Sequence, residues 1–204
     1  MRVRSLPVGR SNLFFRITIT ETRSMQSYDY AHRSGVEAIT WKRFAELTRT
    51  LVEKLAPFNI DAVVGTARAG LFPATAVCLM LRRELYPARV TRRVNDEVRF
   101  QHPQWIVDVA PDVKDKIVAV VDEIADTGET LAVVAERVTQ RGAKQVITAS
   151  LVAHSWADPM PDVVALTTDA LVMFPWDEQI YFDGQWQPHP ELVEALNQLK
   201  SKAS

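Results

Sequence analysis

The sequence has few of the residues that would place it in a specialised class of protein. It holds one cysteine, Cys78, which excludes an intramolecular disulfide and is typical of a protein in a reducing cytosol. No apolar run approaches the roughly 20 residues needed to cross a bilayer, so we expect no membrane partner. Neither charge predominates, since 24 Lys and Arg face 25 Asp and Glu, for a formal net charge of -1. This balance gives no reason to expect nucleic acid as a partner.

Motifs for several common chemistries are missing as well. The chain has no glycine loop ending in Gly-Lys-Ser/Thr, no Gly-x-Gly-x-x-Gly, no His-Glu-x-x-His and no Cys-x-x-Cys. Its four histidines are scattered without the spacing of metal ligands. Only seven glycines are present, so a glycine inside a candidate binding loop carries more weight than usual.

The apolar periodicity predicts an α/β protein. Amphipathic patterns and buried apolar runs alternate along the 204 residues, and Thr40 is a plausible N-cap for the first helix. The expected elements are helices at residues 41–56, 71–83, 130–141 and 190–199, and strands at 60–64, 116–121 and 146–153. This alternation predicts a parallel sheet of about five strands with helices on both faces. Ligands bind such sheets at the carboxyl ends of the strands.

The composition divides the chain into three parts. Residues 1–35 form an arginine-rich N-terminal extension, expected to be partly disordered, in which Met25 is a plausible second start. Residues 36–153 are the expected core, and a polar stretch within them, residues 91–111, is the expected lid. Residues 154–204 would supply a small hood and a C-terminal helix, and the segment 28–33 could also contribute to the hood.

The stretch from Ile117 to Leu131 carries the most chemical information. Five apolar residues predict a buried strand, with the acids Asp122 and Glu123 at its carboxyl end, and a loop then leads into a helix near Gly128. The free amides of a helix N-terminus bind anions, and a glycine lets a phosphate approach the backbone. Acids at such a site would repel the phosphate, so vicinal ribose hydroxyls or a magnesium ion are their natural partners.

Residues 120–130, VVDEIADTGET, resemble the phosphoribosyl-pyrophosphate signature of the type I phosphoribosyltransferases. Each defining position is filled: a strand, two acids, two variable residues, then Asp-Thr-Gly-x-Thr. The resemblance implies that family's parallel-sheet fold with a small hood, and it implies phosphoribosyl pyrophosphate and magnesium as donor and cofactor. The implied donor-binding residues are Asp122, Glu123, Ala125, Asp126, Thr127, Gly128, Glu129 and Thr130.

A second segment, residues 63–73, resembles the pyrophosphate loop of the same family, in which a basic residue lies in a turn of small residues. In relatives this loop often carries a non-proline cis peptide, which the match places near Ala67 and Arg68. Taken alone, the segment is a common strand-turn-helix. The residues expected to bind pyrophosphate are Ala67, Arg68, Ala69 and Gly70, with Arg92 and Arg93 from the lid.

A third segment, residues 171–177, reads LVMFPWD and resembles the hood of the xanthine, guanine and hypoxanthine phosphoribosyltransferases, which closes over the base. The expected base-binding residues are His154, Leu171, Phe174 and Trp176. Trp176 either contacts the base or only packs in the core. The match makes Asp177 a third expected magnesium ligand beside Asp122 and Glu123.

Two residues depart from the pattern of the 6-oxopurine enzymes. Those enzymes have a lysine that donates to the oxo group of the base, and here His154 stands in its place. They also stack an aromatic ring on the purine, where this chain has Leu171. His154 is either a base contact or a satisfied buried histidine. These differences bear on the choice of base and not on the donor.

The resemblance implies substitution at the anomeric carbon of the ribose, with pyrophosphate as the leaving group and Asp126 as the general base. The acceptor would be a purine-like base, and the enzyme would be a cytoplasmic homodimer. Two alternatives stay open. One is a regulator that binds phosphoribosyl pyrophosphate without chemistry, since a fold alone does not fix function. The other is a transferase for a non-purine heterocycle.

Overall fold

A computed structural model describes residues 33–91, 93–94, 97–98, 100 and 104–202. The expectation for residues 1–32 therefore lies outside the described residues. In chain order the elements are β1 Val36–Ala38, α1 Trp41–Leu55, the 3-10 helix η2 Ala56–Phe58, β2 Ala62–Thr66, α2 Leu71–Leu81, β3 Glu84–Thr91, β4 Arg93–Val94, β5 Glu97–Val98, β6 Gln104–Val107, the 3-10 helix η3 Pro111–Val113, β7 Ile117–Ala125, α3 Glu129–Gln140, β8 Gln145–Ala153, β9 Val163–Thr167, β10 Leu171–Met173, β11 Gln179–Phe182, β12 Gln185–Pro188 and α4 Pro190–Lys202.

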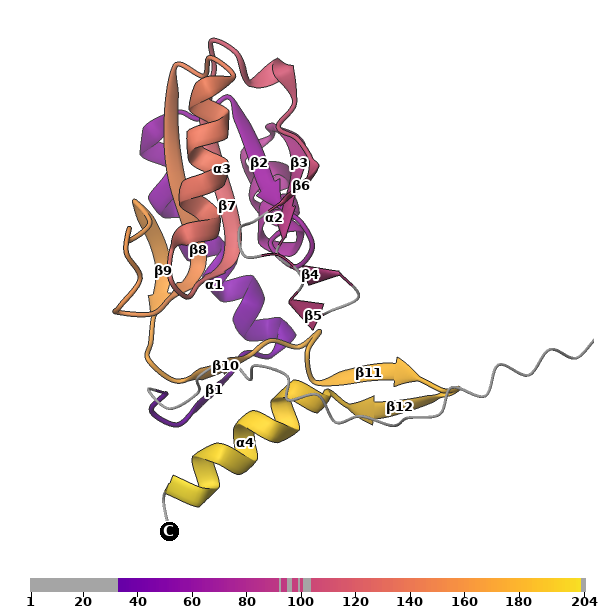
Figure 1. The fold of residues 1–204 in the computed structure, drawn as a ribbon. Coiled ribbons are helices and arrows are strands. Elements are labelled where there is room, and N and C mark those ends of the chain that lie inside the picture. Colours follow the sequence, from indigo (N-terminus) through magenta and orange to yellow (C-terminus); the bar gives the residue numbers. More distant parts are fainter. Residues whose placement is uncertain (1–32, 92, 95–96, 99, 101–103, 203–204) are drawn as a thin grey trace, which may run out of the picture.

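The main sheet has six strands in the order β6-β3-β2-β7-β8-β9 (Figure 1). Five of them, β3, β2, β7, β8 and β9, are parallel, which confirms the predicted sheet. The sixth strand, β6, adds to the edge beside β3 in the antiparallel direction. The sequence pattern did not predict β3, β6 or β9.

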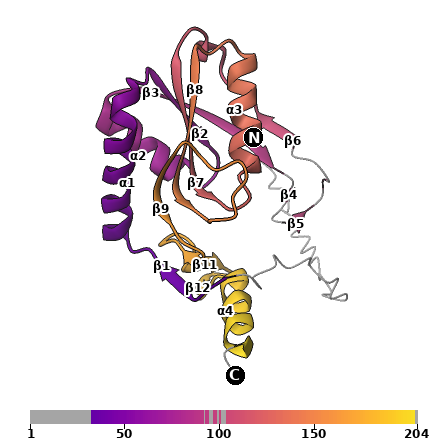
Figure 2. The same cartoon turned by 90° about the vertical axis from the view of Figure 1, so that its left-hand side faces the viewer.

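Alternating side chains of the central strands form two apolar layers. Val63, Ala119 and Val121 pack with α1 and α2 on one face, whereas Val64 and Val120 pack with α3 on the other. Figure 2 shows α1 and α2 on one side of the sheet and α3 on the opposite side. Both faces are covered, so these strands are apolar throughout, as parallel strands usually are.

Local sequence explains most element boundaries. The hydroxyl of Thr40 accepts a hydrogen bond from the amide of Arg43 at 3.1 Å and caps α1 as predicted. The predicted strand 116–121 is too short, because β7 continues to Ala125 by pairing with β8, with Asp122 opposite Ser150. Both acids of the signature therefore lie within the strand and not after it.

The expected lid, residues 91–111, does not form one excursion. Residues 104–107 form β6 and are held in the main sheet by pairing with β3, which leaves the part of the segment before β6 as the expected lid. Within that part, Arg93 lies in the short strand β4, which pairs with β5. Arg92 lies outside the described residues.

The hood combines both ends of the described chain. Strand β1 pairs in parallel with β10, and β11 and β12 form a separate antiparallel hairpin followed by α4 (Figure 1). The expected boundaries at 36 and 154 are therefore wrong in two places. Strand β1 belongs with the hood, whereas β9 belongs to the main sheet because it pairs with β8.

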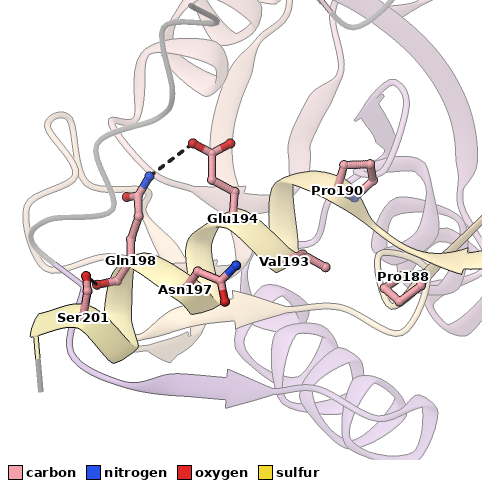
Figure 3. Close-up of a pocket in the computed structure, with 7 residues that line it drawn as sticks. All are labelled: Pro188, Pro190, Val193, Glu194, Asn197, Gln198 and Ser201. Carbon is pink, nitrogen blue, oxygen red and sulfur yellow. Dashed lines mark hydrogen bonds between the residues drawn. The ribbon is translucent and has the colours of Figure 1, made fainter. Parts of the chain in front are cut away.

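A surface pocket lies along α4 (Figure 3). Its lining residues are Pro188, Pro190, Val193, Glu194, Asn197, Gln198 and Ser201. None of them belongs to the three motif segments, so this pocket is not the candidate site. Among the described residues, no helix is long and apolar enough to span a bilayer.

Candidate active site

The two central motif loops meet because their strands are neighbours. Strands β2 and β7 pair in parallel, with Gly65 opposite Val121, so the loop after β2 and the residues after Val121 lie at the same edge of the sheet. This is the edge at which open α/β sheets bind ligands.

The loop at residues 66–70 joins β2 to α2 by a compact turn. The Ala67–Arg68 peptide bond is cis, as the resemblance implied. The amide of Ala67 donates to the carbonyl of Ala88 at 2.7 Å, which ties the turn to β3. Arg68 is exposed while Gly70 is buried. The turn therefore directs one basic side chain outward from a backbone that is held against the sheet.

Gly70 lies directly against the acidic end of β7. A Cβ atom at this position would overlap the Thr66 hydroxyl and the carboxylate of Asp122, and would lie 2.6 Å from the Thr66 carbonyl oxygen. Only a residue without a side chain allows this approach. The expected pyrophosphate loop and the expected ribose anchor are thus in contact in the folded protein.

The two acids of β7 form a pair in which Asp122 is buried and Glu123 is half-buried. Burial raises the pKa of Asp122, against the lowering effect of hydrogen bonds with Glu123 and Thr66. Burial also raises the pKa of Glu123 well above its usual value, and the neighbouring charges of Asp122 and Asp177 raise it further. A cation or hydroxyl donors bound between the two acids would compensate this concentration of negative charge.

The loop after β7 leads into the N-terminus of α3. Gly128 adopts a left-handed conformation, with φ of +85°, and has no side chain to cap α3, while the hydroxyl of Thr127 accepts a hydrogen bond from the amide of Glu129 at 3.4 Å. A Cβ atom on Gly128 would also overlap the carbonyl oxygen of Pro159. Thr127, Glu129 and Thr130 are exposed around this helix start. Free amides, hydroxyls and the positive end of a helix make an anion site.

The acids of the site suit a magnesium ion that is also bound by substrate better than they suit a metal ion bound by protein ligands alone. Asp122, Glu123 and Asp177 supply the hard oxygen atoms that magnesium prefers. Among the described residues, no cluster of three His, Cys, Asp or Glu side chains could hold a metal by itself. Magnesium commonly takes one or two carboxylates and completes its shell with substrate phosphates and water. The residues therefore fit a magnesium ion that arrives with a phosphorylated donor.

The hood residues expected to bind the base are mostly enclosed. Leu171 and Phe174 are buried, and Trp176 stacks against Phe72 and Phe174 at 4.3 and 4.8 Å between ring centroids. Trp176 also packs edge-on against Phe44 of α1. This cluster joins the hood to the helices of the core, and the contact of these side chains with a base stays a prediction.

His154 is fully buried and both its ring nitrogens have partners. Nδ1 lies 2.5 Å from the carbonyl oxygen of Thr168, and Nε2 faces the guanidinium of Arg33. Burial and the nearby Arg33 charge lower the pKa of His154. Its proposed contact with the base stays a prediction.

Asp126 lies in a cluster that the motifs do not contain. Its Oδ1 accepts a hydrogen bond from Nη2 of Arg33 at 3.0 Å and another from Nε1 of Trp156 at 3.2 Å. Arg33 is 93 residues away in sequence, and its place in the segment that could join the hood was the only indication of a role. The side chain of Asp126 remains 28% exposed, so a substrate can reach it.

The phosphoribosyl transferase domain model matches residues 36–183, which is most of the chain and all of the site described above except Arg33. The chain belongs to the phosphoribosyltransferase family. It is an enzyme of that family, and its reaction is phosphoribosyl transfer from phosphoribosyl pyrophosphate.

Solved structures give the same picture of this phosphoribosyltransferase. A purine phosphoribosyltransferase from Pyrococcus horikoshii is 32% identical with a TM-score of 0.64, and the match covers 72% of this chain and 98% of that one. A xanthine-guanine-hypoxanthine phosphoribosyltransferase from Helicobacter pylori is 18% identical, with a TM-score of 0.58 and coverage of 81% and 99%. A hypothetical protein from Neisseria gonorrhoeae with bound ppGpp is 19% identical, with a TM-score of 0.61 and coverage of 85% and 99%. The last two show the fold alone. Comparison with curated proteins gave no significant match.

Proposed function

We propose that this phosphoribosyltransferase transfers the 5-phosphoribosyl group to a purine-like base, with magnesium accompanying the donor. The observation that carries the proposal is the meeting of three parts at one sheet edge: the loop at 66–70, the paired acids of β7 and the N-terminus of α3. Asp126 follows directly, with a carboxylate that is partly open to solvent. The likeness to the Pyrococcus purine phosphoribosyltransferase supports a purine as acceptor.

Each part has a task in the reaction. Asp122 and Glu123 would hold the ribose hydroxyls, directly or through magnesium, and the amides of residues 125–130 would hold the 5-phosphate. Arg68 and the loop around it would hold the pyrophosphate as it leaves. Magnesium, when bound, would neutralise charge on the departing pyrophosphate. Asp126 would accept the proton that the imidazole part of the base loses as its other nitrogen attacks the sugar.

Direct turnover tests the proposal. The enzyme is incubated with magnesium, phosphoribosyl pyrophosphate and one of adenine, hypoxanthine, guanine, xanthine, orotate or uracil, and pyrophosphate release is followed. We expect release with at least one purine. Release only with orotate or uracil would contradict the purine assignment. No release with any base, despite donor binding, would point to a heterocycle outside the panel and would also contradict it.

The donor site is tested separately by calorimetry on the double variant Asp122→Ala, Glu123→Ala. We expect its affinity for phosphoribosyl pyrophosphate with magnesium to fall by at least about 100-fold, which is roughly 2.7 kcal/mol. Glu53→Ala, which removes an exposed acid of α1, is the control and should bind the donor normally. Unchanged donor affinity in the double variant would show that these acids are not the ribose anchor.

A further inference from the structure

Arg33 is a nearly buried cation beside the proposed general base. Its side chain is 8% exposed, Nη2 bonds to Asp126 and Nη1 faces Nε2 of His154. Its guanidinium also lies over the ring of Trp156, 5.2 Å from the centroid. Charged side chains are seldom buried without a specific partner. The guanidinium of Arg33 is thus in contact with three other side chains, those of Asp126, His154 and Trp156.

The contacts of His154 fix which hydrogen bonds it makes. The Thr168 carbonyl can only accept, so Nδ1 of His154 must carry the hydrogen. In a neutral histidine, Nε2 is then an acceptor, and the donor it faces is Arg33. Burial and the Arg33 charge lower the pKa of His154 and so favour this neutral form. In this arrangement His154 anchors Arg33 and cannot donate a hydrogen bond to a base.

The backbone holds Arg33 in place. The amide of Ser34 donates to the carbonyl of Asp169 at 2.9 Å, and the amide of Leu171 donates to the carbonyl of Gly35 at 2.9 Å. The β1–β10 pairing continues this ladder. The Asp169 side chain in turn accepts bonds from the amide and hydroxyl of Ser155. The position of Arg33 is therefore part of the fold and not a surface rotamer.

The cluster of Arg33, His154, Trp156 and Asp126 offers a bound base mainly hydrogen-bond donors, because its one open acceptor, Asp126, is the proposed general base. A guanidinium has five N–H groups and no acceptor, and the two contacts described here use only part of them. Nε2 of His154 is occupied by Arg33, and Nε1 of Trp156 by Asp126. In the described part of the chain, both bonds to Asp126 go to Oδ1, which leaves Oδ2 for the proton of the base.

A purine presents a ring nitrogen of its imidazole part, N7, and its 6-substituent along the same edge. Nη2 of Arg33 lies 3.0 Å from Oδ1 of Asp126. Arg33 therefore faces the 6-substituent of the purine when Asp126 faces N7. An oxo group accepts hydrogen bonds and matches the N–H groups of Arg33 that have no partner among the described residues. An amino group only donates, so it would meet donors and leave groups unpaired, which strongly disfavours binding.

We propose that Arg33 determines base specificity by donating to a 6-oxo group, with His154 as the positioning residue that holds it. The inference rests on the proposed function, because it presumes a purine oriented with its imidazole edge toward Asp126. The enzyme then prefers hypoxanthine, guanine or xanthine to adenine. The preference comes from an arginine on the N-terminal side of β1, in a region outside the three motifs.

Steady-state kinetics on oxo and amino purines test this inference. In Arg33→Gln, kcat/KM for the preferred oxopurine should fall by about 10- to 100-fold, as expected for loss of a charged hydrogen bond. The ratio of oxopurine to adenine turnover should fall with it, while donor affinity stays within about twofold. Arg33→Lys keeps a charged donor and should recover part of the ratio. Arg43→Gln, which removes an exposed arginine of α1, is the control and should change neither quantity.

The ratio of oxopurine to adenine turnover does not depend on how much of the variant is folded. It therefore separates an effect on base recognition from an effect on stability. An unchanged ratio in Arg33→Gln would overturn the assignment, and so would a wild type that prefers adenine while turning over at ordinary rates. A wild type that binds the donor but uses no purine would overturn the proposed function, and the inference with it. His154→Phe, which removes the acceptor that holds Arg33, should lower the same ratio.

Discussion

Substitution of Gly70 by alanine should separate donor binding from overall stability. The added Cβ would overlap the Thr66 hydroxyl and the Asp122 carboxylate and would lie 2.6 Å from the Thr66 carbonyl oxygen. A hydroxyl can rotate away, but the carbonyl belongs to β2 and cannot. The loop must therefore move away from β7, or Asp122 must turn out of its position.

The loss of stability in Gly70→Ala can be estimated from this geometry. One methyl group forced into a filled site lowers the free energy of unfolding by about 1–3 kcal/mol. For a chain of this length, each kcal/mol corresponds to roughly 2–4 °C in Tm. Because the displaced atoms belong to both the pyrophosphate loop and the ribose anchor, we also expect donor affinity to fall by at least about tenfold, or roughly 1.4 kcal/mol.

Gly184→Ala is a matched control. Gly184 has a φ of +77° in the turn of the β11–β12 hairpin, and nothing lies within 4 Å of an added Cβ. The left-handed backbone should cost alanine about 1–2 kcal/mol, so stability falls without any change at the site. Thermal unfolding and calorimetry with phosphoribosyl pyrophosphate and magnesium measure both quantities. Donor affinity equal in the two variants would refute the proposed contact between loop and acids.

Two further substitutions test the acids of the site. Burial and the neighbouring acids raise the pKa of Glu123 in the folded protein, so its contribution to stability is lost as pH rises from the unfolded pKa toward the folded one. Glu123→Gln should therefore raise the Tm of the free enzyme by a few degrees near pH 8 and change it little near pH 4, and a gain of equal size at both pH values would contradict this reasoning. Asp126→Asn keeps the size of the side chain but cannot accept the proton, so kcat should fall by about 10²- to 10⁴-fold with donor affinity nearly unchanged. A kcat within threefold of the wild type, measured by pyrophosphate release, would exclude Asp126 as the general base.

Local patterns were sufficient for the core elements and the central motif. Apolar periodicity predicted α1, α2, α3 and β8 to within a few residues, and the parallel sheet followed from their alternation. The run from Val120 to Thr130 predicted a strand, two acids and a helix start, because each of these depends on neighbours in sequence. The end of β7 was misplaced because the pairing of Ile124 with Val152 of β8, and not its own sequence, extends the strand.

Strands at the sheet edges and in the hood gave weaker patterns. Strand β3 contains Pro87 and half-buried positions, so it lacks the uniform apolar run of β2. Strand β6 alternates little and is fixed by its pairing with β3. The three-residue strands β1 and β10 are too short to show a period, and they exist because they pair with each other across the chain.

The sequence by itself determined the family, the donor motif and the acids that accompany it, since all of these lie in contiguous segments whose chemistry depends on spacing. Only the tertiary structure decided how the residues of the proposed base site are paired. Asp126, His154 and Arg33 come from three separate segments, and nothing in the composition of one segment specifies its partner in another. Folding places them together through the β1–β10 ladder and the β7–β8 pairing. Folding also brings the guanidinium of Arg33 against Nε2 of His154, a contact that neither segment indicates by itself.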